Sequence, residues 1–196
     1  DADVIVAQSW ADLDRISSKD ASVVIRTSKK NLFENYLRLV TAISETPRLN
    51  VVITDIHKFS ESDFDTYKNI LEQLLENVKD LYVNGKYVQL NILTDRMLME
   101  DMNNCNAGCE SITLAPDGKF YVCPAFYLES DGYSVGDLIT GLDIKNQQLY
   151  RLDHAPICRK CDAYQCRRCV WLNRKTTLEV NTPSHEQCVV SHLERN

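Results

Sequence analysis

The cysteines of this chain all lie in its second half, and their spacing is the strongest constraint that the sequence places on the fold. They follow the pattern C-x3-C-x13-C, then C-x2-C-x4-C-x2-C after a gap of 34 residues, then one more cysteine after a gap of 18. The eight positions are Cys105, Cys109, Cys123, Cys158, Cys161, Cys166, Cys169 and Cys188. Eight thiolates can ligate two four-coordinate metal centres, and iron–sulfur clusters or zinc usually occupy all-thiolate sites.

Disulfide bonds are the other common use of an even number of cysteines. Disulfide frameworks are typical of small domains that lack a sufficient core. Here 44% of the 196 residues are apolar and 26% are charged, which is an ordinary globular composition. The paired C-x2-C spacing is also typical of metal-binding knuckles. We therefore expect reduced thiols, a metal site and a cytoplasmic location.

Charge and hydropathy exclude two kinds of partner. The net charge of −6 argues against nucleic acid as a partner. No apolar run approaches the roughly 18–20 residues that a membrane span needs, and no signal peptide precedes the first strand-like segment. The chain begins at Asp1 rather than at a methionine, so we expect it to be a piece of something longer.

Residues 1–104 alternate between strand-like and helix-like segments. Apolar and β-branched runs predict strands at residues 4–7, 22–26, 49–54 and 87–93. Apolar residues at helical spacing predict helices that follow Ser9, Ser28 and either Ser60 or Ser62. This alternation is the signature of a parallel sheet built from βαβ units. No glycine-rich nucleotide-binding motif is present in the sequence.

Polar residues follow two of these predicted strands. Asp55 and His57 come after one strand, and Thr94 and Asp95 come after the last. The carboxyl ends of parallel strands face the ligand crevice in sheets of this class. The four residues are therefore weak candidates for substrate contact, and an ordinary loop role is the alternative.

From residue 105 onward the chain has few long apolar segments. Residues 111–123 predict a β-hairpin with a Pro-Asp-Gly turn, which would carry Cys123 to the same end as Cys105 and Cys109. Thr182 and Pro183 have the residue types of an N-cap and a first helical position, so they predict a closing helix. That helix would present the last cysteine.

Only four residues separate the two C-x2-C pairs, whereas zinc ribbons usually place roughly 15–20 residues between them. We therefore expect the two pairs to split between two metal centres, with a single zinc knuckle as the alternative. Six cations lie nearby: Arg159, Lys160, Arg167, Arg168, Arg174 and Lys175. They could offset the negative charge of a 4Fe–4S cluster, or they could form a solvated basic loop.

These cysteines carry a resemblance to a known family. The spacing C-x12-G-x4-C, counted from Cys105 through Gly118 to Cys123, resembles the opening of the SPASM domain of radical SAM peptide-modifying enzymes. The four-cysteine run and the distant last cysteine resemble its second half, although two gaps are one residue shorter. The surrounding residues resemble the CXXX repeat peptide maturases at 105–108, 115–124, 135–138 and 181–185.

The resemblance implies a fold and a ligand set. The α/β fold would be a partial parallel βα barrel-type layer in residues 1–104, then a loop-rich SPASM-like metal domain in residues 105–196 with a β-hairpin and a C-terminal helix. One 4Fe–4S cluster would take Cys105, Cys109, Cys123 and Cys169. The other would take Cys158, Cys161, Cys166 and Cys188. The base that relatives carry just after the third cysteine is replaced here by Pro124, so the catalytic base is unknown.

The resemblance also implies a function. The chain would be the C-terminal, auxiliary-cluster half of a radical SAM enzyme that modifies a ribosomal precursor peptide. The C-x3-C-x2-C motif that holds the SAM-cleaving cluster is absent from these residues. SAM, a further 4Fe–4S cluster and an N-terminal remainder of the enzyme would therefore be required, together with a reducing electron donor. A degenerate, non-catalytic member of the family is the competing account of the missing motif. The alternative is a zinc-stabilised, non-catalytic domain that binds a peptide or a protein.

Overall fold

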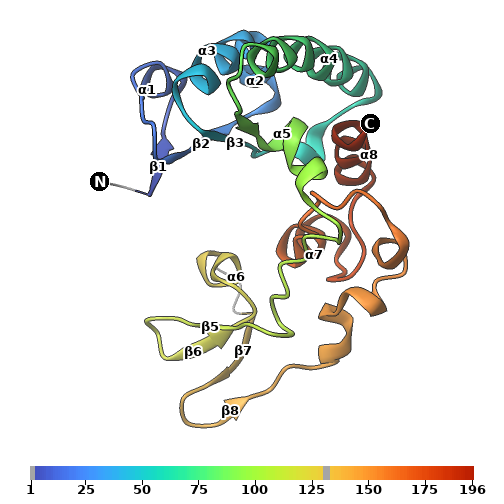
Figure 1. Cartoon of the computed structure of the whole chain (residues 1–196). Coiled ribbons are helices and arrows are strands. Elements are labelled where there is room, and N and C mark those ends of the chain that lie inside the picture. The colour runs from blue at the N-terminus through green and yellow to red at the C-terminus, as the bar shows by residue number, and fades with distance from the viewer. Residues whose placement is uncertain (1–2, 130–132) are drawn as a thin grey trace. The chain divides into compact units, whose positions relative to one another are not determined.

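The structure is a computed structural model that describes residues 3–129 and 133–196 (Figure 1). It divides into two compact units, each of which is described by itself. The first unit consists of Asp1–Glu100 together with Glu186–Asn196, and the second consists of Asp101–His185. Among the described residues, no helix has both the length and the apolar character that a membrane-spanning segment needs.

A four-stranded parallel sheet forms the centre of the first unit. Its strands are β1 (Val4–Ala7), β2 (Ser22–Thr27), β3 (Arg48–Ile53) and β4 (Gln89–Leu90). They lie side by side in sequential order, which results when every crossover advances by one strand in the same direction. The predicted parallel sheet is therefore confirmed.

Helices pack against one face of this sheet, as Figure 1 shows for α2, α3 and α4. In β2, Val23, Ile25 and Thr27 are buried while the residues between them are more exposed, because side chains of a strand alternate between its faces. The helices of this part are α1 (Trp10–Leu13), α2 (Lys29–Asn35), α3 (Leu37–Glu45), α4 (Glu61–Val83) and α5 (Asn91–Thr94). Short 3-10 turns follow β3 at Ile56–Lys58 and α5 at Asp95–Leu98.

Serine residues cap three of these helices, as predicted. The side chains of Ser9 and Ser28 each accept a hydrogen bond from the backbone N–H three residues later. Ser60 forms a capping box with Asp63 at the start of α4. Such caps satisfy N–H groups that have no partner within the helix. The long helix predicted after Ser28 is divided at Tyr36 into α2 and α3.

The predicted strand at residues 87–93 is shorter than expected, because β4 ends at Leu90. The side chain of Asn91 explains the early end. The Val51 backbone N–H in β3 donates to Asn91 Oδ1 at 2.7 Å, and Asn91 Nδ2 donates to the Val51 carbonyl at 3.1 Å. The amide side chain thus makes the hydrogen bonds that a continued strand would have made, and the chain turns into α5.

The last helix, α8 (His185–Arg195), belongs mainly to the first unit. Val190 is part of the hydrophobic core of that unit, and the Glu194 carboxylate accepts a hydrogen bond from Tyr67 in α4. This arrangement differs from the predicted domains, which assigned all of residues 105–196 to the second. The helix also begins two residues later than Pro183, where the sequence predicted its first helical position.

The second unit contains a small antiparallel sheet. Its strands are β5 (Thr113–Leu114), β6 (Lys119–Tyr121), β7 (Ser134–Asp137) and β8 (Gly141–Leu142). They also lie in sequential order. The β5–β6 pair confirms the predicted hairpin, and its turn contains Gly118 with a φ of 77°. The strands β7 and β8 were not predicted.

Two helices and three 3-10 turns complete the described part of this unit. The helices are α6 (Pro124–Leu128) and α7 (Val170–Thr177), and the turns lie at Gln147–Tyr150, Leu152–His154 and Cys158–Lys160. Residues from the hairpin, α6 and α7 share one hydrophobic core, which includes Tyr121, Phe126 and Val170. The chain is therefore a mixed α/β protein with one parallel and one antiparallel sheet.

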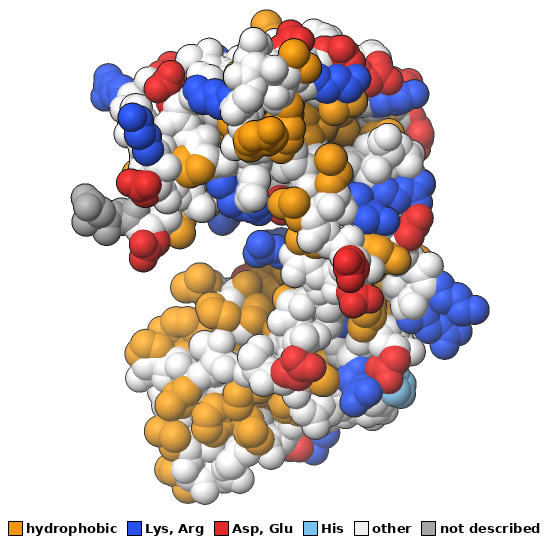
Figure 2. All heavy atoms as spheres, in the orientation of Figure 1, with side chains coloured by type: hydrophobic (Ala, Val, Ile, Leu, Met, Phe, Trp, Pro, Cys, Tyr) orange, Lys and Arg blue, Asp and Glu red, His pale blue; other side chains and the backbone are white. Residues whose placement is uncertain are grey.

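Exposed apolar side chains cover part of the antiparallel sheet. Figure 2 shows hydrophobic side chains gathered over the part of the second unit that carries β5, β6 and β8. Exposed residues of this region include Leu114, Leu138, Ile139 and Leu142. Contiguous apolar patches on a protein surface often mark contact with another molecule.

Candidate metal centre

The eight cysteines all lie in the described ranges, and no disulfide bond joins them. Cys105 is exposed, Cys158 is buried and the others are partly exposed. Across residues 3–129 and 133–196, no three cysteine, histidine or carboxylate side chains lie close enough together to hold a metal ion. The donor set suits a thiolate-bound metal chemically, but its members would have to move closer together on binding.

The loop that carries Cys105 and Cys109 is a tight turn. Asn106 and Gly108 both have left-handed backbone conformations, with φ of 53° and 81°. The Cys109 N–H donates to the Asn106 carbonyl at 3.1 Å, and the Gly108 N–H donates to the Ser111 carbonyl at 2.8 Å. The turn reverses the chain between the two cysteines, just before β5 begins.

The thiol of Cys169 caps the start of α7. Its Sγ accepts a hydrogen bond from the Leu172 N–H at 3.5 Å, and the Trp171 N–H also contributes. Burial raises the pKa of Cys169, and the neighbouring Cys105 and Cys123 thiols raise it further. Cys105 and Cys123 therefore both lie within electrostatic range of Cys169, although the three thiols come from separate parts of the sequence.

One hydrophobic core explains why these thiols are neighbours. Ala107 lies between Cys105 and Cys109 in the sequence, Val122 precedes Cys123, and Val170 follows Cys169. The three apolar residues are all buried in the same core. The loop, the hairpin and α7 thus each contribute a buried residue, adjacent in sequence to a thiol or between two thiols, to one core, against which Cys123 itself packs.

Cys158, Cys161 and Cys166 lie in a compact segment before α7. The Cys161 N–H donates to the Cys158 carbonyl at 3.0 Å, and the Cys166 N–H donates to the Ala163 carbonyl at 3.0 Å. The Ala163 N–H donates to Cys161 Sγ at 3.4 Å. Ala163 is fully buried, so it anchors the segment between the two cysteine pairs. Cys188, the fourth member of the predicted second set, lies on α8.

Arg168 is the largest fully buried side chain of the described chain. Its Nε donates a hydrogen bond of 2.7 Å to Asn104 Oδ1, and one terminal nitrogen donates to the Tyr150 carbonyl. The other terminal nitrogen, Nη1, is buried without a hydrogen-bond partner. Arg168 also has a left-handed φ of 43°, which is uncommon for a residue other than glycine.

The groups that favour the charged form of Arg168 are thiols. Burial lowers the pKa of Arg168, and the Cys158, Cys105, Cys166 and Cys109 thiols oppose that effect. Two of the four belong to each predicted ligand set. No carboxylate of the described residues forms an ion pair with this guanidinium. The sequence grouped Arg168 with five other cations and gave no reason to single it out.

The other five cations have different surroundings. Arg159, Lys160 and Arg167 are exposed. Lys175 forms an ion pair of 2.6 Å with Glu129, and Arg174 lies over an aromatic ring in a pocket that is described below. The alternative of a solvated basic loop therefore fits the three exposed cations, but it does not fit Arg168.

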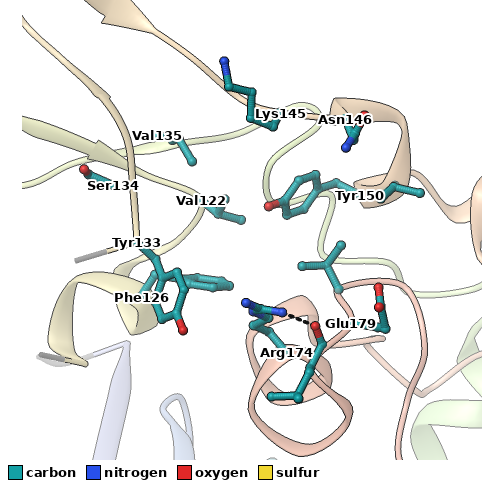
Figure 3. Close-up of a pocket in the computed structure, with 13 residues that line it drawn as sticks. Val122, Phe126, Tyr133, Ser134, Val135, Lys145, Asn146, Tyr150, Arg174 and Glu179 are labelled. Carbon is teal, nitrogen blue, oxygen red and sulfur yellow. Dashed lines mark hydrogen bonds between the residues drawn. The ribbon is translucent and has the colours of Figure 1, made fainter. Parts of the chain in front are cut away.

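A pocket of about 380 Å³ opens beside the shared core (Figure 3). Tyr150 and Arg174 point into it, and the guanidinium of Arg174 lies 5.4 Å from the centre of the Tyr133 ring. Val122, next to Cys123 in the sequence, also lines it. Aromatic rings beside a cation suit an apolar chain that carries an acidic or carbonyl group. Nothing in the sequence indicated this pocket.

Tyr150 connects the pocket to the thiol loop. Its carbonyl accepts the hydrogen bond from Arg168, and its ring packs directly on the backbone of Gly108. A Cβ atom on Gly108 would lie 2.6 Å from Tyr150 Cδ1. Burial raises the pKa of Tyr150, which keeps its hydroxyl protonated.

The predicted substrate residues of the first unit have local roles. Asp55 accepts a hydrogen bond of 2.7 Å from the first N–H of α2. Asp95 forms an ion pair of 2.8 Å with Arg48, and the hydroxyl of Thr94 bonds to the backbone at the end of β4. His57 is exposed. These contacts favour the ordinary loop role for Asp55, Thr94 and Asp95. The exposure of His57 does not decide between the two roles.

Comparison with known proteins adds no family to this description. A scan of the chain against models of protein families gives no match, and no curated protein sequence matches it.

Proposed function

We propose that this chain is the auxiliary-cluster half of a radical SAM enzyme that modifies a ribosomal precursor peptide. The observation that carries the proposal is the common core formed by Ala107, Val122 and Val170, which are sequence neighbours of the first thiol set. Spacing predicted that the four-cysteine run would split, and the resemblance assigned its last member to the loop and the hairpin. A fold that buries Val170 in the same core as Ala107 and Val122 supports that split.

The proposed ligands form two sets. The first consists of Cys105, Cys109, Cys123 and Cys169, and the second consists of Cys158, Cys161, Cys166 and Cys188. The place of Cys188 in the second set rests on the resemblance alone. With four thiolates each, both 4Fe–4S clusters would have every iron ligated by protein, and they would serve electron transfer rather than substrate coordination.

The protein would tune such clusters through the groups around the sulfur atoms. Bound iron–sulfur clusters supply one-electron transfer, and hydrogen bonds to the ligating sulfurs help to set their potential. The N–H groups of Leu172 and Trp171 donate to Cys169 Sγ, and the Ala163 N–H donates to Cys161 Sγ. These donors are held in place by helix α7 and by the buried segment before it.

The pocket beside Tyr150 is the proposed contact for the precursor peptide. Val122 and Phe126 of the shared core line it, and its cation and aromatic rings can hold a peptide chain through apolar and polar contacts. SAM and its cluster would be supplied by an N-terminal remainder of the enzyme, and electrons would come from a reducing donor.

Anaerobic reconstitution of the chain with iron and sulfide tests the proposal. We expect about eight iron atoms per chain and a visible absorption typical of 4Fe–4S clusters. We also expect no formation of 5′-deoxyadenosine from SAM above background, because the three-cysteine motif is absent from these residues. Zinc bound by all eight thiols in anaerobically prepared native protein would contradict the cluster assignment and favour a zinc-stabilised binding domain.

A further inference from the structure

We propose that Arg168 is a buried cation shared by both thiolate metal centres, and that it strengthens metal binding at each of them. The inference rests on the proposed function, because it requires two thiolate-bound centres. It goes beyond that function by assigning a role to a residue that ligates no metal.

The burial of Arg168 requires a compensating negative charge. A guanidinium loses strong hydration when it is taken out of water, so buried charges are almost always paired. Arg168 has no exposed surface, and no carboxylate of the described residues forms an ion pair with it. Its two hydrogen bonds go to neutral groups, the Asn104 amide and the Tyr150 carbonyl.

Thiolates are the groups that can supply the missing charge. Arg168 directly precedes Cys169 of the first set and follows Cys166 of the second by two residues, and its partner Asn104 directly precedes Cys105. Its charge accordingly interacts with Cys105 and Cys109 of the first set and with Cys158 and Cys166 of the second. Metal binding requires these thiols to lose their protons. A centre with four thiolates around a divalent ion or a 4Fe–4S cluster is net negative, so the guanidinium would become paired only when the centres are filled.

The fold holds Arg168 between the two sets at a cost. A left-handed backbone is sterically unfavourable for a residue other than glycine, and Arg168 adopts it with a φ of 43°. Nη1 is buried without a hydrogen-bond partner among the described residues. Both features destabilise the metal-free chain, and a favourable interaction with the bound metal centres would offset them. A hydrogen bond from Nη1 to a ligating sulfur would satisfy the nitrogen.

Two consequences follow from a shared cation. Removal of the charge should weaken both centres rather than one, because Arg168 interacts with thiols of both sets. It should also make each cluster harder to reduce, because reduction adds a negative charge that the guanidinium stabilises.

Titration of the reduced, metal-free chain with Co²⁺ tests the first consequence, since thiolate-bound Co²⁺ absorbs in the visible range. The variant Arg168→Met removes the charge, and Arg168→Lys retains it. Arg167→Met is the matched control, because Arg167 is the adjacent residue and is exposed. We expect Arg168→Met to weaken Co²⁺ binding about tenfold or more at both sets, and we expect the other two variants to change it much less.

The two sets can be followed one at a time. Cys161→Ser leaves the first set complete, and Cys123→Ser leaves the second complete, so Arg168→Met is added to each. Loss of affinity in both backgrounds supports a shared cation. An unchanged affinity in either background overturns it. If Arg168→Met does not fold, as judged by circular dichroism, Arg168→Gln gives the same comparison while it retains an N–H donor for Asn104.

The reduction potentials of the reconstituted clusters give a second measurement. We expect both midpoint potentials to shift downward in Arg168→Met and to stay close to the original values in Arg167→Met. A shift of neither or of only one potential contradicts the inference and leaves the proposed function intact. Failure of the unaltered chain to bind Co²⁺ or clusters through its thiols would instead contradict the proposed function itself.

Discussion

The hydroxyl of Tyr67, in the second turn of α4, donates a hydrogen bond of 2.8 Å to the carboxylate of Glu194 in the last helix. Tyr67 is fully buried, and burial together with the nearby Glu194 charge raises the pKa of Tyr67 well above its ordinary value. The bond joins two parts of the first unit that are 127 residues apart in the sequence. The chain therefore returns to its first unit after it has formed the second.

The first prediction concerns this bond. Tyr67→Phe removes the hydroxyl and should lower the free energy of unfolding by about 1–2 kcal/mol, because hydrogen bonds to charged groups contribute more than neutral ones. Urea denaturation of the reduced, metal-free chain, followed by circular dichroism, measures the loss. Glu194→Gln and the double variant complete a cycle that isolates the pair.

Tyr36→Phe provides the matched control for that prediction. The Tyr36 hydroxyl also donates to a side chain of α4, Gln73 Oε1, at 2.7 Å, but this bond is exposed. We expect its removal to change stability by less than about 0.5 kcal/mol. Equal losses for the two tyrosine variants would show that burial of the Tyr67 bond does not matter.

The second prediction is a dependence on acid pH. Asp63 accepts hydrogen bonds from Lys29 Nζ and from Ser60, which lower the pKa of its carboxyl group from 3.8 to about 2. The folded chain thus binds this proton more weakly than the unfolded chain. Ionised Asp63 therefore stabilises the fold above pH 3.8, and this contribution disappears as the pH falls towards 2.

Asp63→Asn should therefore be less stable than the unaltered chain by about 1 kcal/mol at neutral pH. The difference should shrink as the pH is lowered from 4 to 2. Urea denaturation at a series of pH values measures it. Asp65→Asn removes the same charge from an exposed position of α4 and is the matched control for the change in charge. A difference that persists unchanged at pH 2 would contradict the assignment.

The third prediction separates the two thiol sets. Cys123→Ala removes a ligand of the first proposed set, and Cys161→Ala removes one of the second. After anaerobic reconstitution, each variant should retain about half of the iron of the unaltered chain, because one 4Fe–4S cluster remains. Their electron paramagnetic resonance spectra after reduction should differ, since a different cluster survives in each. Loss of all iron in both variants would argue against two separate sets.

Much of the first unit could be predicted because its signals are local. The apolar runs of β1, β2 and β3 and the serine caps before α1, α2 and α4 act within a few residues of themselves. The end of β4 depends instead on Asn91, whose side chain bonds to Val51 in another strand. No local pattern reports such a contact. The placement of α8 likewise depends on Val190 and Glu194 meeting residues far away in the sequence.

In the candidate site, too, local sequence patterns could be interpreted, whereas features that depend on distant contacts could not. Cysteine spacing alone indicated a metal site, because few other uses require thiols at such intervals. The sequence could not distinguish Arg168 from Arg167, which are adjacent residues of the same type. One is fully buried and the other is exposed, and the difference comes from the backbone conformation and from the partners Asn104 and Tyr150. The pocket beside Tyr150 was missed for the same reason.

The last prediction concerns the contact between the Cys105–Cys109 loop and Tyr150. Gly108→Ala would place a Cβ atom 2.6 Å from Tyr150 Cδ1, in a backbone conformation with a φ of 81°. Either the ring or the loop must move. Because the Tyr150 carbonyl holds Arg168, the change should also disturb the site. We expect the metal-free chain to lose about 2–3 kcal/mol of stability, and we expect the first thiol set to bind Co²⁺ more weakly.

Gly118→Ala is the matched control, since Gly118 has a similar φ of 77° in the same unit but only an ordinary contact of 3.9 Å with Leu138. It should lose only the conformational part, about 1 kcal/mol, and bind Co²⁺ as the unaltered chain does. Similar losses of stability and affinity in both variants would show that the contact with Tyr150 has no part in holding the thiol loop.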